Sequence, residues 1–112
     1  MEECLFCKII KSNIPAKIIH EDEDTMAFYD INPVAPTHVL IVPKKHISRI
    51  SDMKEGDIDL VGKLFYVAKK IMKELSIEDY RLIFNNGSKA CQSVFHLHLH
   101  VLGGREFSWP EG

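Results

Sequence analysis

Apolar and polar residues follow two different periods along this chain of 112 residues. From Asp57 to Leu75 apolar side chains recur about every 3.6 residues, with lysines on the opposite face, which predicts one long amphipathic helix. The positions expected to face the core are Ile58, Val61, Leu64, Phe65, Ala68, Ile71, Met72 and Leu75. A shorter apolar repeat from Cys4 to Lys11 predicts a short first helix, which Pro15 prevents from continuing.

Five other segments are rich in β-branched and aromatic residues, which favour extended strands. The expected strands are 17–21, 25–31, 38–42, 80–85 and 95–102. The acidic residues 22–24 link the first two, as in a β-hairpin. This pattern predicts an α+β fold with a five-stranded, mostly antiparallel sheet and one long and one short helix. The whole chain, 1–112, is expected to form one domain because no linker divides it.

The last predicted strand carries three of the six histidines, His96, His98 and His100. Successive side chains of a strand point to opposite faces, so the three imidazoles share one face and the apolar residues between them share the other. Each neutral imidazole needs a partner for its donor and another for its acceptor, which an ordinary core does not supply three times. Two chemical interpretations compete: a group of metal ligands, and a histidine nucleophile positioned by its neighbours.

Composition narrows the classes of function. A hydrophobic share of 46% and a charged share of 27% are ordinary for a globular protein, and a net charge of −2 offers no basic surface to long nucleic acid. The acidic start lacks the apolar run of a signal peptide, and no stretch of about 18 apolar residues would span a membrane. We therefore expect a cytoplasmic protein with neither long nucleic acid nor a membrane as its partner. The composition leaves a small anionic ligand open.

Three cysteines, an odd number, argue against a framework of disulfides. Cys4 and Cys7 have the spacing at which two thiolates bind one Zn²⁺ ion, and a structural site then needs two more ligands, for which His46 and His96 are candidates. Unliganded thiols and a redox pair are alternatives, although the parallel βαβ context of a thioredoxin-like motif is missing. A catalytic zinc site made of the three strand histidines is another alternative.

Neutral imidazole is also a competent nucleophile, because its ordinary pKa is about 6.5, and it can carry a phosphoryl or nucleotidyl group transiently. One ring nitrogen attacks, so the other must hold its proton against an acceptor. Developing charge on a phosphate then needs donors nearby, and the stretch 85–100 supplies a serine hydroxyl, loop amides and further imidazoles. The chain has no G-x-x-x-x-G-K-[ST] motif, which excludes a P-loop enzyme.

The sequence His96-Leu97-His98-Leu99-His100-Val101-Leu102 resembles the full signature of the histidine-triad (HIT) family. Further blocks resemble the Hint branch of that family, the nucleoside phosphoramidate hydrolases. These blocks are 28–33, 35–38, 42–47, 92–94 and the stretch from Gly103 to Pro110. The resemblance covers nearly the whole chain. It implies a HIT-like fold and a homodimer whose two sheets join, with a purine-nucleotide pocket in each subunit.

The resemblance also implies roles for single residues. His98 matches the nucleophile, which forms a nucleotidyl-histidine intermediate that water hydrolyses. His100 and His38 match imidazoles near the phosphate and the leaving group. Other matches are Ser93 for the phosphoramidate nitrogen, Asp30 for the ribose hydroxyls, Asn85 for the phosphate side, and Leu5, Phe6, Ile9, Phe28 and Ile31 for the base. In members with an N-terminal C-x-x-C pair, the residues matching Cys4, Cys7, His46 and His96 hold structural zinc. No organic cofactor is implied.

Cys91 is a departure from the pattern, because well-known Hint proteins have glycine at this position of the phosphate loop. The expected activity is hydrolysis of adenosine 5′-phosphoramidate and related purine nucleoside phosphoramidates. Two alternatives stay open: a nucleotide-binding or partner-binding module with incidental turnover, and a dinucleoside polyphosphate hydrolase. The resemblance places the tail with Trp109 near the partner's active site, where the tail would influence which leaving groups are accepted.

Overall fold

The computed structural model describes residues 4–110 and 112. Its helices and strands are α1 (Leu5–Ile10), β1 (Ile18–Glu21), β2 (Thr25–Tyr29), β3 (Thr37–Pro43), α2 (Ile58–Glu74), β4 (Tyr80–Ile83) and β5 (Leu99–Gly103). Short 3₁₀ turns cover Ile50–Asp52, Glu55–Asp57 and Ser88–Ala90. Within these described ranges neither helix has the length and apolarity needed to cross a bilayer.

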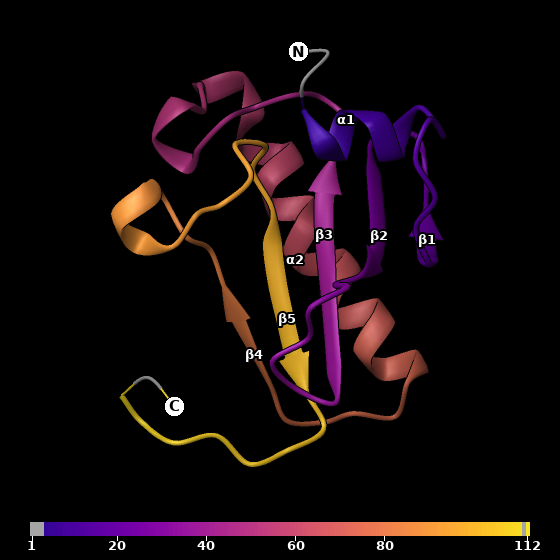
Figure 1. Ribbon diagram of the computed structural model, residues 1–112, viewed down its shortest axis with the longest axis vertical. Helices are drawn as coiled ribbons and strands as arrows, with labels where there is room; N and C mark the ends of the chain where they lie inside the picture. Colours follow the sequence, from indigo (N-terminus) through magenta and orange to yellow (C-terminus); the bar gives the residue numbers. More distant parts are fainter. Residues whose placement is uncertain (1–3, 111) are drawn as a thin grey trace.

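The five strands form one antiparallel sheet in the order β1-β2-β3-β5-β4, which confirms the predicted fold class (Figure 1). The pairing of β3 with β5 sets His38 opposite Leu102 and Leu40 opposite His100. Residues directly opposite in a ladder point to the same face, and so do alternate residues of one strand. The register therefore brings His38 and His100, which are far apart in sequence, onto one face of the sheet.

Each face of the sheet has its own hydrophobic core. On one face, α2 covers the middle of the sheet (Figure 1), and the buried residues there are Ala27, Val39, Ile41, Ile47, Val61, Leu64, Val67, Ala68, Ile71, Met72, Leu97, Leu99 and Val101. On the other face, Phe6 and Ile9 of α1 pack against a smaller set, Met26, Phe28, Leu40 and Val42. Because α1 is short, it covers only part of that face, and the functional groups lie on the same side.

The long helix differs in detail from the expected apolar stripe. Phe65 and Ile58 were expected in the core, but they are 43% and 58% exposed, and Leu75 at the end of the stripe is also exposed. Val67 is buried instead. Phe65 lies beside Phe84, which directly follows β4. Because β4 is an edge strand, little of the sheet remains to cover Phe65. The expected placement of Phe65, Ile58 and Leu75 is therefore wrong, and the buried stripe is rotated away from the sheet edge.

The histidine strand is shorter than expected, because β5 begins at Leu99 and not at residue 95. The preceding segment follows the irregular chain after β3, where the Leu97 N–H donates to the Ile47 carbonyl at 2.6 Å. The alternation nevertheless continues, since Leu97 joins the α2-side core together with Leu99. His96 and His98 therefore keep the predicted face but lie outside the ladder, where their rings are free to bond to main-chain groups.

Candidate active site and metal centre

A cavity of about 320 Å³ opens on the α1 side of the sheet, and its lining is mostly apolar. This volume falls in the range of small-ligand pockets. Among the predicted site residues, those that line it are Leu5, Phe6, Ile9, Phe28, Asp30, Ile31, Ser93, His98 and His100. Other lining residues were not predicted, namely Ile14, Pro15, Ala16, Tyr29, Asn32, Leu40 and Val94. Residues 14–16 reach the cavity only through the turn after α1. Their side chains carry no functional group, so the sequence gives no indication of this position.

Two of the residues predicted for the nucleotide site, Asn85 and His38, do not line the cavity. Asn85 is half-buried and lies outside the set of lining residues, so its role on the phosphate side stays a prediction. His38 is buried behind His100, with its Nε2 2.9 Å from the Nδ1 of that ring. His38 therefore does not face the cavity itself; it contacts His100, which does.

The His98 ring is fixed by a main-chain carbonyl. Its Nδ1–H donates to the carbonyl oxygen of His96 at 2.7 Å, and Phe6 packs against it at a ring-centroid distance of 5.0 Å. A carbonyl only accepts hydrogen bonds, so in the neutral ring the proton is on Nδ1 and the lone pair is on Nε2. Since Nδ1 is occupied, Nε2 is the nitrogen available to a molecule in the cavity. This is the arrangement that a nucleophilic imidazole requires.

Asp30, His38 and His100 form a second group of functional side chains, called here the carboxylate cluster. A carboxylate oxygen of Asp30 lies 3.4 Å from His38 Nε2, and the His100 ring lies 4.8 Å from the His98 ring between centroids. On the far side of the cluster, the main-chain N–H of Val34 donates to His38 Nδ1 at 3.2 Å. The cluster is therefore continuous from the loop after β2 to the nucleophile candidate.

Burial lowers the pKa of these histidines. The pKa of His100 is lowered to about 4, first by burial and then by the nearby His98 and His38. Burial is also the main reason why the pKa values of His98 and His38 lie below the ordinary 6.5, and the charge of Asp30 offsets this only in part. All three rings are therefore neutral at pH 7, which is the state in which an imidazole acts as a nucleophile.

Cys4, Cys7, His46 and His96 converge into a third group, called here the thiol cluster, in which the four ligand atoms all lie within 4.8 Å of one another. Cys4 caps the start of α1, and Cys7 follows one turn later. The Sγ atoms of Cys4 and Cys7 lie 3.3 and 3.5 Å from His96 Nδ1, and His46 Nδ1 lies 3.2 Å from it. The spacing of the sequence thus predicted a set of residues that the fold brings together.

The donor chemistry of the thiol cluster fits a zinc ion. His96 Nε2–H donates to the Pro43 carbonyl at 2.8 Å, so His96 Nδ1 directs its lone pair at the other three ligand atoms. Ligand nitrogens about 2.0 Å from a tetrahedral zinc are about 3.3 Å apart, close to the 3.2 Å between the two Nδ1 atoms. A carbonyl behind a metal-binding histidine is the usual supporting contact. Two thiols and two imidazoles fill all four positions, as in a structural site.

The alternative of a zinc site made from the three strand histidines finds no support in this geometry. His96 turns its free nitrogen toward the cysteines, whereas His98 Nδ1 is bonded to a carbonyl and His100 Nδ1 faces His38. The three rings thus serve different partners, although they lie on one face of the chain.

Gln92 holds the loop that carries Ser93. Its buried side-chain amide accepts from the Gly87 N–H at 2.8 Å and donates to the carbonyls of Ser48 and Val94 at 2.8 and 3.0 Å. Cys91 precedes it with a φ of 73°, in the left-handed region that favours glycine, and its side chain is exposed. The loop therefore keeps a conformation suited to glycine although the residue there is cysteine.

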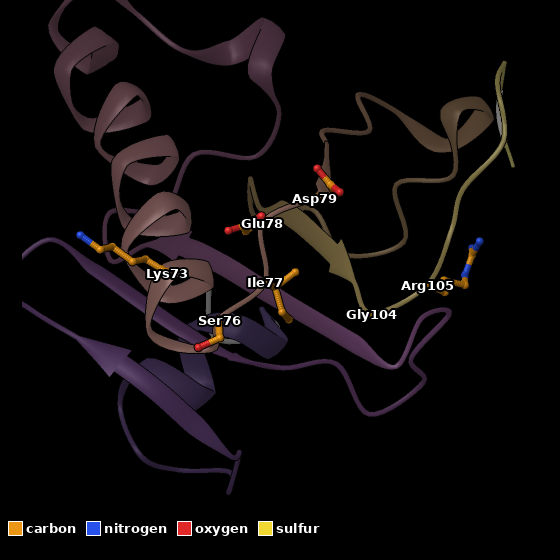
Figure 2. Close-up of a pocket in the computed structure, with 7 residues that line it drawn as sticks. All are labelled: Lys73, Ser76, Ile77, Glu78, Asp79, Gly104 and Arg105. Atoms are coloured by element: carbon orange, nitrogen blue, oxygen red, sulfur yellow. The ribbon is translucent and has the colours of Figure 1, made fainter.

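A separate hollow of about 630 Å³ lies between the end of α2, the start of β4 and the residues after β5. Its lining includes Lys73, Glu78, Asp79 and Arg105 (Figure 2). Figure 2 shows the ammonium group of Lys73 directed away from the guanidinium of Arg105, so the charged groups do not converge on one point. The described residues that line this hollow therefore do not form the convergent polar set of a ligand site.

Residues 11–107 match the HIT domain family, and the chain therefore belongs to that family. A 14 kDa zinc-binding protein of Zea mays is 48% identical over 111 residues, which cover 96% of this chain and 87% of that protein. The crystal structure of a HIT family hydrolase from Legionella pneumophila matches with a TM-score of 0.93 and 49% identity, covering 98% of this chain and 100% of that chain. The histidine triad nucleotide-binding protein from Candida albicans matches with a TM-score of 0.82 and 35% identity, covering 98% and 85%.

Proposed function

We propose that the chain is a hydrolase of purine nucleoside phosphoramidates that acts through a nucleotidyl-histidine intermediate, as in the Hint branch of its family. The observation that carries this proposal is the lone pair on His98 Nε2, which the main chain leaves free at a cavity of small-ligand size. The hydrolase from Legionella pneumophila and the nucleotide-binding protein from Candida albicans support both halves of the proposal, chemistry and ligand class.

The cavity offers separate surfaces to the parts of a nucleotide. Phe6, Ile9 and Phe28 are buried apolar side chains suited to the flat base. The Asp30 carboxylate accepts hydrogen bonds, as ribose hydroxyls require, and it is held in place by the Asn32 N–H at 2.8 Å. The phosphate then lies beside His98 and His100. Adenine and guanine both fit this division of the cavity.

In the first step of the proposed reaction, His98 Nε2 attacks the phosphorus and the P–N bond to the amine breaks. The electron pair of that bond leaves with the amine nitrogen, which takes up a proton that the Ser93 hydroxyl passes on from water. The ring gains positive charge as the Nε2–P bond forms, and the His96 carbonyl at Nδ1–H stabilises this charge. His100 donates to a phosphate oxygen.

In the second step, water attacks the phosphorus and the Nε2–P bond breaks. The water gives its proton to solvent, and the nucleoside monophosphate leaves. Neutral His98 is restored with its proton still on Nδ1, ready for another cycle. Burial, which lowers the pKa of His98, favours this return to the neutral ring.

Zinc in the thiol cluster would act as a structural cross-link. When bound, the ion joins α1 to the segments after β3 and before β5, without an open position for substrate. The zinc-binding protein of Zea mays supports this assignment. In our proposal the zinc ion takes no part in the catalytic steps.

We further propose that the chain forms a homodimer. Large apolar side chains are exposed on α2 and on β4, one of the two edge strands, including Ile58, Phe65, Tyr66 and Leu82. An unpaired edge strand with apolar residues beside it favours pairing with a second copy. Sedimentation of the wild-type chain, compared with a Phe65→Glu variant, tests this assembly, and a wild-type monomer would contradict it.

The test of the proposed function compares steady-state kcat/KM for adenosine 5′-phosphoramidate with that for a dinucleoside polyphosphate. The phosphoramidate is expected to be the better substrate. Mass spectrometry of protein sampled during turnover, without acid treatment, is expected to show a nucleotidyl group on His98. A preference for the dinucleoside polyphosphate would move the chain to another branch of its family. Nucleotide binding without turnover of either compound would make it a binding module.

A further inference from the structure

The main-chain N–H of Val34 lies at the start of a chain of hydrogen bonds that ends in the cavity. It is 3.2 Å from His38 Nδ1, and an amide N–H can only donate. His38 Nδ1 must therefore carry the lone pair, and in the neutral ring the proton is on Nε2. A loop residue outside the cavity thus determines the tautomer of a buried histidine.

The next contact transmits this choice to His100. His38 Nε2–H faces His100 Nδ1 at 2.9 Å, so His100 Nδ1 accepts and the proton of His100 is on Nε2. The Asp30 carboxylate, 3.4 Å from the same His38 nitrogen, is also an acceptor and favours the same tautomer. Among the described residues, no group hydrogen-bonds His100 Nε2, which leaves this N–H for a ligand.

We propose that the main-chain amide of Val34 is a positioning group that holds His38 and, through it, keeps the His100 Nε2–H directed at the phosphate. His98 and His100 then present opposite polarity side by side, a lone pair for the phosphorus and an N–H for a phosphate oxygen. The catalytic consequence rests on the proposed function, whereas the tautomers themselves do not depend on it.

The loop between β2 and β3, which carries Val34, fixes the backbone at this residue and leaves its side chain in solvent. The Asp30 N–H donates to the His38 carbonyl at 2.9 Å, which closes the loop at its base. The Arg105 guanidinium lies 3.5 Å from the Val34 carbonyl, on the other side of the same residue. The Val34 side chain itself is 61% exposed. The backbone at this position is therefore constrained while the side chain is free to change.

The same polarity argues against a metal ion in the carboxylate cluster, although its three ligand atoms lie within 4.8 Å of one another. A metal needs the His38 Nε2 lone pair, and the amide behind Nδ1 keeps a proton on Nε2. The cluster is assigned to hydrogen bonding, and metal binding there is an outcome that the test must exclude.

The first measurement uses the wild-type chain loaded with zinc and needs no substrate. Long-range ¹H–¹⁵N NMR spectra distinguish protonated from unprotonated imidazole nitrogens. The expected result is Nε2–H for His38 and His100 but Nδ1–H for His98. An Nδ1–H tautomer of His100 would overturn the proposal, and so would displacement of the His38 proton by one equivalent of Co²⁺ added to the zinc-loaded chain.

The second measurement removes the amide proton. Val34→Pro deletes the N–H, Val34→Ala keeps it and is the matched control, and an amide-to-ester replacement at Val34 deletes it with the valine side chain retained. The Pro and ester variants are expected to show mixed His100 tautomers and a kcat about fivefold lower with unchanged KM, as one lost neutral hydrogen bond would produce. Val34→Ala is expected to match the wild type.

The ester variant keeps the proposal falsifiable if Val34→Pro does not fold. Wild-type tautomers in the ester variant would overturn the positioning role, and so would mixed tautomers with an unchanged kcat. If the wild type shows the expected tautomers but hydrolyses no phosphoramidate, the proposed function fails while the assignment of protons stands.

Discussion

The thiol cluster and the carboxylate cluster lie on the same side of the molecule, and each has a buried histidine at its centre. Behind His96 is the Pro43 carbonyl, an acceptor, which fixes the proton at the back of the ring and directs a lone pair forward. Behind His38 is the Val34 amide, a donor, which fixes the lone pair at the back and directs an N–H forward. The forward lone pair suits a metal ion, and the forward N–H suits another hydrogen-bond acceptor.

This difference shows that the main chain behind a histidine ring, and not only the kinds of side chain, decides the chemistry of a cluster. In both clusters the possible ligand atoms lie within 4.8 Å of one another. The main-chain group behind the central ring separates them, because it sets which nitrogen of the ring holds the proton. The following predictions test this separation, beginning with the largest effect.

Replacing His98, the proposed nucleophile, is expected to have the largest effect on turnover. We expect His98→Asn to lower kcat at least about a thousandfold, because the side chain forms a bond in the reaction. Nucleotide affinity is expected to remain, because the side chain acts in bond formation more than in binding. Zinc content is also expected to remain, since His98 is not part of the thiol cluster. Single-turnover kinetics, calorimetric binding and elemental analysis check these three points. Turnover close to that of the wild type would refute the assignment of His98.

Replacing a thiol is expected to lower stability and zinc content but not turnover, the opposite of replacing His98. Zinc should copurify with the wild type, and Cys7→Ser should lower its content and cost several kcal/mol in free energy of unfolding, because the ion is bound only by the folded chain. The kcat of the molecules that remain folded should change little. Cys91→Ser is the matched control, since Cys91 is exposed and outside the cluster. Denaturant unfolding and metal analysis decide this, and a chelator that stops catalysis without loosening the fold would contradict it.

The pH dependence of turnover separates neutral from charged imidazoles. The proposed mechanism requires neutral His98 and His100. Burial lowers the pKa of His98 and lowers that of His100 to about 4. A lowered pKa means that the neutral, deprotonated form survives to lower pH. We expect kcat/KM to stay level as the pH falls through 6.5 and to decline only closer to the lowered values.

The same shifts predict the direction of a change in stability. Between the ordinary pKa of about 6.5 and the lowered values, the unfolded chain binds more protons than the folded chain, so stability falls as the pH falls through this window. Urea unfolding at pH 7 and pH 5 with excess zinc measures it. For the pH profile of turnover, a fall of kcat/KM that began at pH 6.5 or above would show that the rings are not desolvated as described.

The smallest expected effect concerns the tail after β5. Trp109 is 87% exposed, while Phe107 is stacked by Arg105 and Arg81, and Arg81 also donates to the Ser108 carbonyl at 3.0 Å. We expect deletion of 108–112, or Trp109→Ala, to leave a folded dimer and an intact His98 site but to change the ranking of phosphoramidates that differ in their amine, by about fivefold. Measuring kcat/KM for two amines tests this, and an equal loss for both would refute a role in specificity.

Much of the fold could be predicted from periodicity. The long helix expected at 57–75 runs from Ile58 to Glu74, and the hairpin expected around the acidic link is formed by β1 and β2. Phe65 was misplaced because a helical period gives the angle of a side chain but not the width of the sheet beneath it. The strand from 95 was drawn too long because alternation continues after the ladder ends.

The candidate site was predictable where side chains carry the chemistry. The C-x-x-C spacing and the three histidines indicated the thiol cluster and the nucleophile candidate, and family resemblance indicated Asp30 and Ser93. The contacts that orient the rings come from the main chain of Pro43, Val34 and His96. Almost every residue has a carbonyl and an amide, so no sequence pattern distinguishes the ones that matter.

His96 takes part in both groups with different atoms: its ring belongs to the thiol cluster, and its carbonyl orients His98. Because the carbonyl belongs to the main chain, it survives replacement of the ring. A lineage that lost the cysteines and the metal would thus keep the tautomer of its nucleophile, provided that the backbone stayed in place. The proposed metal site and the proposed reaction are therefore separable in evolution, although they share a residue.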